Sequence, residues 1–116
     1  MPYIRLETTE SVAPEQRASL CARLSRLVAQ GTGKPEAYVM VVVEDGLTML
    51  HAGAAGPAAF AEVRSIGGLS SQANRALAQG LCGLLAEALG VPGERIYLNF
   101  AEVEAGCWGH DGTTFG

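Results

Sequence analysis

The chain repeats one apolar pattern after an interval of 57 residues. Four apolar residues at helical spacing recur 57 positions later as four leucines. The two sets are Leu20, Leu24, Leu27 and Val28, and then Leu77, Leu81, Leu84 and Leu85. Each predicted helix stops at a glycine and is soon followed by a proline, in Gly33-Lys34-Pro35 and in Gly90-Val91-Pro92. The repeat predicts one structural unit used twice.

A β-rich segment lies on either side of each predicted helix. In the first half these segments are residues 3–6 and 38–43, and in the second half they are residues 60–66 and 95–100. Because a helix returns the chain across a sheet, the two strands of each half should be parallel. The expected fold class is α+β: a two-layer sandwich of two β-α-β units, with a four-stranded mixed sheet and both helices on one face. We expect a single domain over residues 1–116, with pseudo-repeats at about 1–50 and 58–105.

Composition narrows the class of protein. The chain has 116 residues, of which 48% are hydrophobic, enough to bury a core. Its net charge of −4 and its scattered Lys and Arg residues favour neither nucleic acid nor an anionic membrane as a partner. Charged residues interrupt the N-terminal segment, and no apolar run is long enough to span a bilayer, so a cytoplasmic location is expected.

The cysteines indicate neither a disulfide framework nor a metal site. Cys21, Cys82 and Cys107 are odd in number and far apart. Neither His51 nor His110 stands at metal-ligand spacing from a cysteine. We expect three reduced thiols and no metal.

The segment 38–43 is apolar on both faces of its predicted strand. Val39, Val41 and Val43 would point one way, and Met40 and Val42 the other. Helices are expected to cover only one face, whereas a strand apolar on both faces needs cover on both. Another copy of the same chain is the economical cover, which predicts a homo-oligomer.

Seven short motifs occur in a fixed order along the whole chain. They are Met1-Pro2, Gly33-Lys34-Pro35, Ser65-Ile66-Gly67, Asn74-Arg75, the segment 81–87, the segment 95–99 and the terminal Thr114-Phe115. In this order and near this spacing they resemble the macrophage migration inhibitory factor family of the tautomerase superfamily. The resemblance implies a homotrimer whose sheets line a central barrel, which would supply the missing cover.

Pro2 carries the chemistry that the resemblance implies. A small second residue permits removal of Met1, which would leave Pro2 with a free secondary amine. An α-amino group titrates closer to neutrality than a lysine, and burial in an apolar pocket lowers its pKa further. A neutral amine can take a proton from carbon and return it elsewhere. The resemblance therefore implies a cofactor-free keto–enol tautomerase acting on phenylpyruvate-like α-keto acids, active only once Met1 is removed.

Four further residues are implied as substrate contacts. Lys34 and the backbone N–H of Ile66 would bind the substrate carboxylate, which favours a fixed cation together with amide donors. Without the resemblance, Lys34 is a solvated cation at a helix C-terminus and Ile66 a core residue. Tyr97 and Asn99 share one face of a strand and are implied to reach the pocket of the neighbouring subunit. A structural hydrogen bond at the subunit contact is the alternative for Asn99.

Aromatic side chains would form the walls of the pocket. The resemblance implies Trp108 and Phe115, with Tyr38 as a weaker candidate. Counting back from Phe115 without gaps puts His110, rather than Trp108, at the family's usual tryptophan position. The choice between these two side chains is left open by the sequence.

Two alternative functions stay open at this level. A dehalogenase or decarboxylase of the same superfamily would need two or more arginines and a carboxylate near the proline, and Arg64 and Arg75 are available. A cytokine-like signalling protein would keep the fold with a vestigial pocket and would have a protein receptor as its partner. Secretion without a signal peptide occurs in this family, and the sequence leaves it open for this chain. Residues 58–61 lack the Cys-x-x-Cys pair of the mammalian cytokine, so thiol oxidoreductase activity is not expected.

Overall fold

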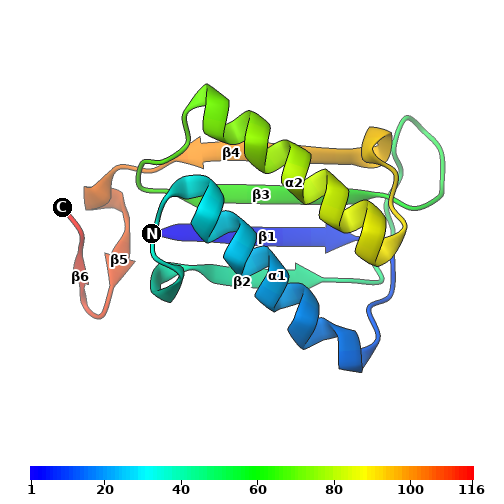
Figure 1. The fold of residues 1–116 in the computed structure, drawn as a ribbon, viewed down its shortest axis with the longest axis horizontal. Coiled ribbons are helices and arrows are strands. Elements are labelled where there is room, and N and C mark those ends of the chain that lie inside the picture. The colour runs from blue at the N-terminus through cyan, green and yellow to red at the C-terminus, as the bar shows by residue number, and fades with distance from the viewer.

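The computed structural model describes residues 1–116 and consists of two β-α-β halves followed by a short hairpin (Figure 1). The first half contains β1 (Pro2–Thr8), α1 (Pro14–Thr32) and β2 (Met40–Glu44), and the second contains β3 (Ala59–Ser65), α2 (Ser71–Leu89) and β4 (Ile96–Glu102). Short 3-10 turns at Glu36–Tyr38 and Gly93–Arg95 precede β2 and β4. A third 3-10 turn, Ala105–Cys107, leads into the hairpin of β5 (Gly109–His110) and β6 (Thr113–Thr114).

The main sheet has the strand order β2-β1-β3-β4. β1 runs parallel to β2, β3 runs parallel to β4, and the two central strands β1 and β3 are antiparallel. Both helices lie across the same face of this sheet (Figure 1). The predicted fold class and the parallel pairing within each half are therefore confirmed.

The repeat extends to the helix ends. Each helix has 19 residues and ends at a glycine, Gly33 or Gly90, with φ 70° and ψ 20°. Only glycine adopts this left-handed conformation freely, and the proline two residues later cannot continue the helix. The predicted strand 38–43 began too early, because Tyr38 lies in a 3-10 turn and β2 starts at Met40. The predicted strand 60–66 ran one residue too far, since Ile66 follows the end of β3.

The core lies between the helices and one face of the sheet. Alternate residues of β1 and β3 are buried, as expected for strands covered on one side. They pack against the apolar stripes of the two helices, of which Leu24, Leu77, Leu81 and Leu85 are almost fully enclosed. Burying each such side chain contributes about 2 kcal/mol. Neither helix has both the length and the apolar character needed to cross a bilayer.

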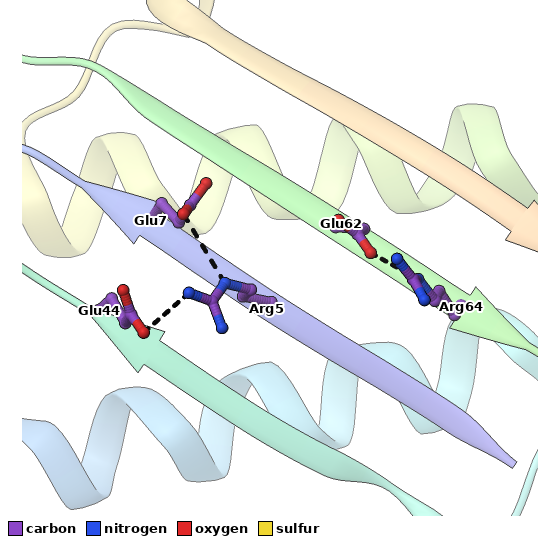
Figure 2. Close-up of polar contacts among 5 residues, drawn as sticks. All are labelled: Arg5, Glu7, Glu44, Glu62 and Arg64. Atoms are coloured by element: carbon purple, nitrogen blue, oxygen red, sulfur yellow. Dashed lines mark hydrogen bonds and ion pairs between the residues drawn. The ribbon is translucent and has the colours of Figure 1, made fainter. Parts of the chain in front are cut away.

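The opposite face of the sheet is charged along its two central strands (Figure 2). Arg5 on β1 contacts Glu44 on β2 at 2.8 Å and Glu7 at 3.7 Å, and Arg64 pairs with Glu62 on β3. The apolar outer face expected for residues 38–43 does not extend to the centre of the sheet, where polar residues alternate with core residues. On β2, Met40 is 63% exposed and so needs cover from outside the chain. The homo-oligomer stays a prediction.

Candidate active site at the N-terminus

A cleft of about 300 Å³ opens at the N-terminal end of β1. Four of the predicted site residues line it: Pro2, Tyr38, Trp108 and Phe115. His110 lines the same cleft, so both candidates for the family's tryptophan position face it. The lining is mostly apolar, which suits the ring of an aromatic ligand.

Three distant segments form this cleft. The parallel pairing of β1 with β2 places Tyr3 opposite Met40, which brings the 3-10 turn Glu36–Tyr38 beside the N-terminus. The C-terminal hairpin supplies the other wall. Its His110 and Phe115 rings stack at 5.8 Å with 12° between their planes. The hairpin was not predicted, because two-residue strands leave no periodic pattern in the sequence.

Lys34 and Ile66 lie beside the N-terminus at the polar end of the site. Pro2 pairs with Ser65, so Ile66 follows directly on the neighbouring strand. The Lys34 Nζ lies 3.6 Å from the position that a Cβ on Gly67 would occupy. None of the hydrogen bonds outside the helices and strands uses the N–H of Ile66, Gly67 or Gly68. A cation and three unpaired N–H donors are thus gathered where a carboxylate could bind.

Residues 66–68, which we call the 66–68 turn, are held against the end of α1. Gly67 and Gly68 have φ of 74° and 80°, a region that other residues rarely adopt. A Cβ on Gly68 would lie 2.5 Å from the carbonyl oxygen of Thr32. Glycine at this position therefore lets the turn approach the segment that carries Lys34.

The electrostatic environment favours a neutral amine at the N-terminus. Burial, and secondarily the positive charge of Lys34, hold the pKa of the Met1 amine below its usual value. Pro2 is more deeply buried than Met1. The same surroundings would disfavour the protonated form of a Pro2 amine once Met1 is removed.

Tyr97 and Asn99 do not join the cleft within one chain. They pair with Phe60 and Glu62 on β3, several residues along the strand from the Ser65 that pairs with Pro2. The Tyr97 side chain is 65% exposed. Both residues lie on the sheet face away from the helices, and their delivery to the site of a neighbouring copy stays a prediction.

The arginines of the dehalogenase alternative are not assembled at Pro2. Arg64 pairs with Glu62 and lines an adjoining cleft with Tyr3 and Cys107. Arg75 is exposed on α2. No three His, Cys, Asp or Glu side chains form a cluster suited to a metal ion.

The sequence of the whole chain matches a known family. A family model described as macrophage migration inhibitory factor matches residues 1–116. The chain belongs to the macrophage migration inhibitory factor family. A family member from Brugia malayi, a macrophage migration inhibitory factor homolog, is 35% identical over 118 residues, covering 100% of both chains.

Solved structures of macrophage migration inhibitory factor homologues have the same fold. The homologue from Prochlorococcus marinus aligns with a TM-score of 0.93 and 35% identity, covering 98% of this chain and 99% of its own. A more distant relative, determined after inactivation by 2-oxo-3-pentynoate, has a TM-score of 0.85 and 26% identity, covering 97% of this chain and 94% of its own. Membership in this family also places the chain in the tautomerase superfamily.

Proposed function

We propose that the chain is a cofactor-free keto–enol tautomerase acting on phenylpyruvate-like α-keto acids through the amine of Pro2, after removal of Met1. The observation that carries the proposal is the position of Pro2 between an aromatic wall and a group of cationic and N–H donors. Aromatic side chains line the cleft on one side. Lys34 and the unpaired N–H groups of the 66–68 turn lie on the other.

The cleft matches the two ends of such a substrate. Lys34 and the N–H of Ile66 would hold the carboxylate, and the aromatic ring would lie among Tyr38, Trp108 and Phe115. Carbon 3 would then lie between them, next to Pro2. The neutral amine takes a proton from carbon 3, and the resulting ammonium delivers that proton to the keto oxygen, giving the enol with no net gain or loss of protons.

The proposal includes a neighbouring copy of the chain. Tyr97 and Asn99 are exposed on an edge strand and have no role in the cleft of their own chain. In a homotrimer they would enter an adjacent cleft, where the Asn99 amide would hydrogen-bond the substrate. The homotrimer is the assembly that the resemblance to this family implies, and the chain shares the family's fold.

A pair of matched variants tests the role of Pro2. Pro2→Gly is compared with Ala59→Gly, which changes the residue 57 positions later, at the opposite end of the sheet. Phenylpyruvate turnover should fall at least about tenfold in Pro2→Gly and change little in Ala59→Gly. Intact mass must first show that Met1 is absent. Undiminished turnover in Pro2→Gly would refute the proposal.

The lowered pKa predicts the pH profile. The burial and the Lys34 charge that lower the pKa of the Met1 amine would act in the same way on the Pro2 amine once Met1 is removed, so kcat/KM should fall only at a pH below the usual α-amino pKa. The compound 2-oxo-3-pentynoate, itself an α-keto acid, offers a second readout. Addition of the Pro2 nitrogen to its alkyne forms one N–C bond without a leaving group. The chain should gain the mass of one whole inhibitor, located on Pro2, and excess phenylpyruvate should slow the reaction.

A further inference from the structure

The end of β4 holds the 66–68 turn from both sides. The N–H of Val103 donates to the carbonyl oxygen of Ser65 at 2.9 Å. The N–H of Leu69 donates to Oε1 of Glu102 at 3.1 Å. Between these two bonds lie the three residues whose N–H groups have no acceptor. Glu102 and Val103 therefore determine where the turn begins and where it ends.

The first half of the chain contains the same contact. There, the N–H of Val12 donates to Oδ2 of Asp45 at 2.7 Å. Val12 and Leu69 are 57 residues apart, and so are Asp45 and Glu102. In each half, a carboxylate at the end of the second strand holds the backbone just before the helix. Asp45 lies at the opposite end of the sheet from Pro2, since β2 runs parallel to β1.

The surroundings of Glu102 connect this contact to the candidate carboxylate site. The Leu69 side chain is anchored in the core, where it is 7% exposed. The Leu69 backbone is then held at its N–H by Glu102 and at its carbonyl oxygen by the Asn74 side chain, which donates to it at 3.3 Å. Gly68 lies against Thr32, directly before the Gly33-Lys34 segment. The orientation of the turn relative to Lys34 is thus set by contacts on three sides.

We infer that Glu102 is a positioning residue for the substrate carboxylate. By holding the N–H of Leu69, it keeps the N–H of Ile66 directed at the anion that Lys34 binds. This inference rests on the proposed function. Because the carboxylate does not react, its contacts stabilise the bound substrate and the transition state alike. Loss of the Glu102 bond should therefore raise KM and leave kcat nearly unchanged.

Three variants of the full chain, with Met1 removed, test this role. Glu102→Ala deletes the acceptor, Glu102→Gln keeps an oxygen at the same place, and Asp45→Ala deletes the equivalent acceptor in the first half. For phenylpyruvate we expect KM to rise roughly fivefold in Glu102→Ala. This rise corresponds to the loss of one hydrogen bond between the Ile66 N–H and the substrate carboxylate. Glu102→Gln should stay within about twofold of the wild type, because its amide oxygen still accepts. Asp45→Ala should leave KM unchanged.

Several outcomes would overturn the inference. An unchanged KM in Glu102→Ala would do so, as would an equal rise in Asp45→Ala, which would indicate a general loss of stability. A Gln variant as impaired as the Ala variant would show that charge, rather than the hydrogen bond, matters. If Glu102→Ala does not fold, Glu102→Ser replaces it, since a serine side chain is too short to reach Leu69.

Hydrogen exchange separates failure of this inference from failure of the proposed function. The amide of Leu69 should exchange faster in Glu102→Ala, and that of Val12 faster in Asp45→Ala. A wild-type chain without turnover would refute the proposed function, while the exchange rates would still test the positioning. Unchanged exchange at Leu69 and its neighbours in Glu102→Ala would refute the positioning whatever the turnover.

Discussion

At the end of the sheet away from Pro2, the counterparts of Pro2 and Lys34 have different chemistry. The counterpart of Pro2 is Ala59, which lies in the middle of the chain, so its nitrogen stays an amide after removal of Met1. The counterpart of Lys34 is Val91, which is 0% exposed and part of the core. The two ends thus share a backbone, while only one of them carries a cation and a terminal amine.

The two ends differ also in one backbone hydrogen bond. At the far end, Thr9 is the counterpart of Ile66, and its N–H donates to the carbonyl oxygen of Ala58 at 3.1 Å. The counterpart of Ala58 is Met1, and no such bond forms between Ile66 and Met1. The strand end beside Pro2 therefore leaves the N–H of Ile66 without the bond that its counterpart makes. An N–H without a partner in the chain is free to donate to a ligand at this end of the sheet.

The largest change in stability should come from placing a lysine at Val91, the counterpart of Lys34. Val91→Lys places an ammonium in the core without a partner, which should lower the free energy of unfolding by at least about 3 kcal/mol. Urea denaturation measures this loss. The reverse change, Lys34→Val, should raise KM for phenylpyruvate and hardly alter stability. Equal stability of the two variants would contradict the difference between the two ends.

Arg95 provides the next test, because its counterpart Tyr38 lines the cleft. The Arg95 guanidinium donates to the carbonyl oxygens of four residues in the segment joining the halves, His51, Ala54, Gly56 and Pro57. Arg95→Ala should lower the free energy of unfolding by about 2 kcal/mol and leave KM unchanged. Tyr38→Ala should raise KM and leave the free energy of unfolding nearly unchanged.

A surface arginine is the control for that prediction. Arg23 pairs only with Glu87, on the outer side of the helices, at 2.9 Å. Exposed pairs contribute about 0.5 kcal/mol, so Arg23→Ala should change little. A loss in Arg95→Ala no larger than in Arg23→Ala would show that the joining segment is held by other contacts.

Substitutions at the two helix ends should have effects of intermediate size on the free energy of unfolding. Gly33 and Gly90 share the same left-handed conformation, and a Cβ on either would meet nothing within 4 Å. Alanine at either position should therefore lower the free energy of unfolding by a similar amount, about 1 kcal/mol. Only Gly33→Ala should raise KM, because Lys34 follows it. A rise in KM in both variants would mean that helix stability, rather than the position of Lys34, governs binding.

The smallest effect concerns Asp45 and its dependence on pH. The N–H of Val12, and more weakly Arg17, hold the pKa of Asp45 below its usual range against the opposing effect of desolvation. The ionised carboxylate therefore stabilises the fold above the usual aspartate pKa, and this contribution is lost as the pH falls through the lowered pKa. The difference in Tm between the wild type and Asp45→Ala should shrink on acidification. A difference independent of pH would contradict this account.

The sequence by itself determined the fold class and most of the candidate site. The repeat of apolar stripes, glycine stops and prolines requires only local spacing, so it predicted two equivalent halves and the parallel strands within each. Pro2, Lys34, Ile66 and the aromatic residues could be named because short motifs keep their order along the chain. Strand ends were less certain, as at Tyr38, because a 3-10 turn and a strand edge favour similar residues.

Only the tertiary structure decided which of these residues meet. It placed both Trp108 and His110 at the cleft, since a short hairpin turns two alternate residues toward the N-terminus. It also kept Tyr97 and Asn99 away from the cleft of their own chain. The carboxylate of Glu102 became important only beside Leu69, a residue 33 positions earlier. Such contacts depend on strand order and register, which no local pattern specifies, because they form only when the sheet brings distant segments together.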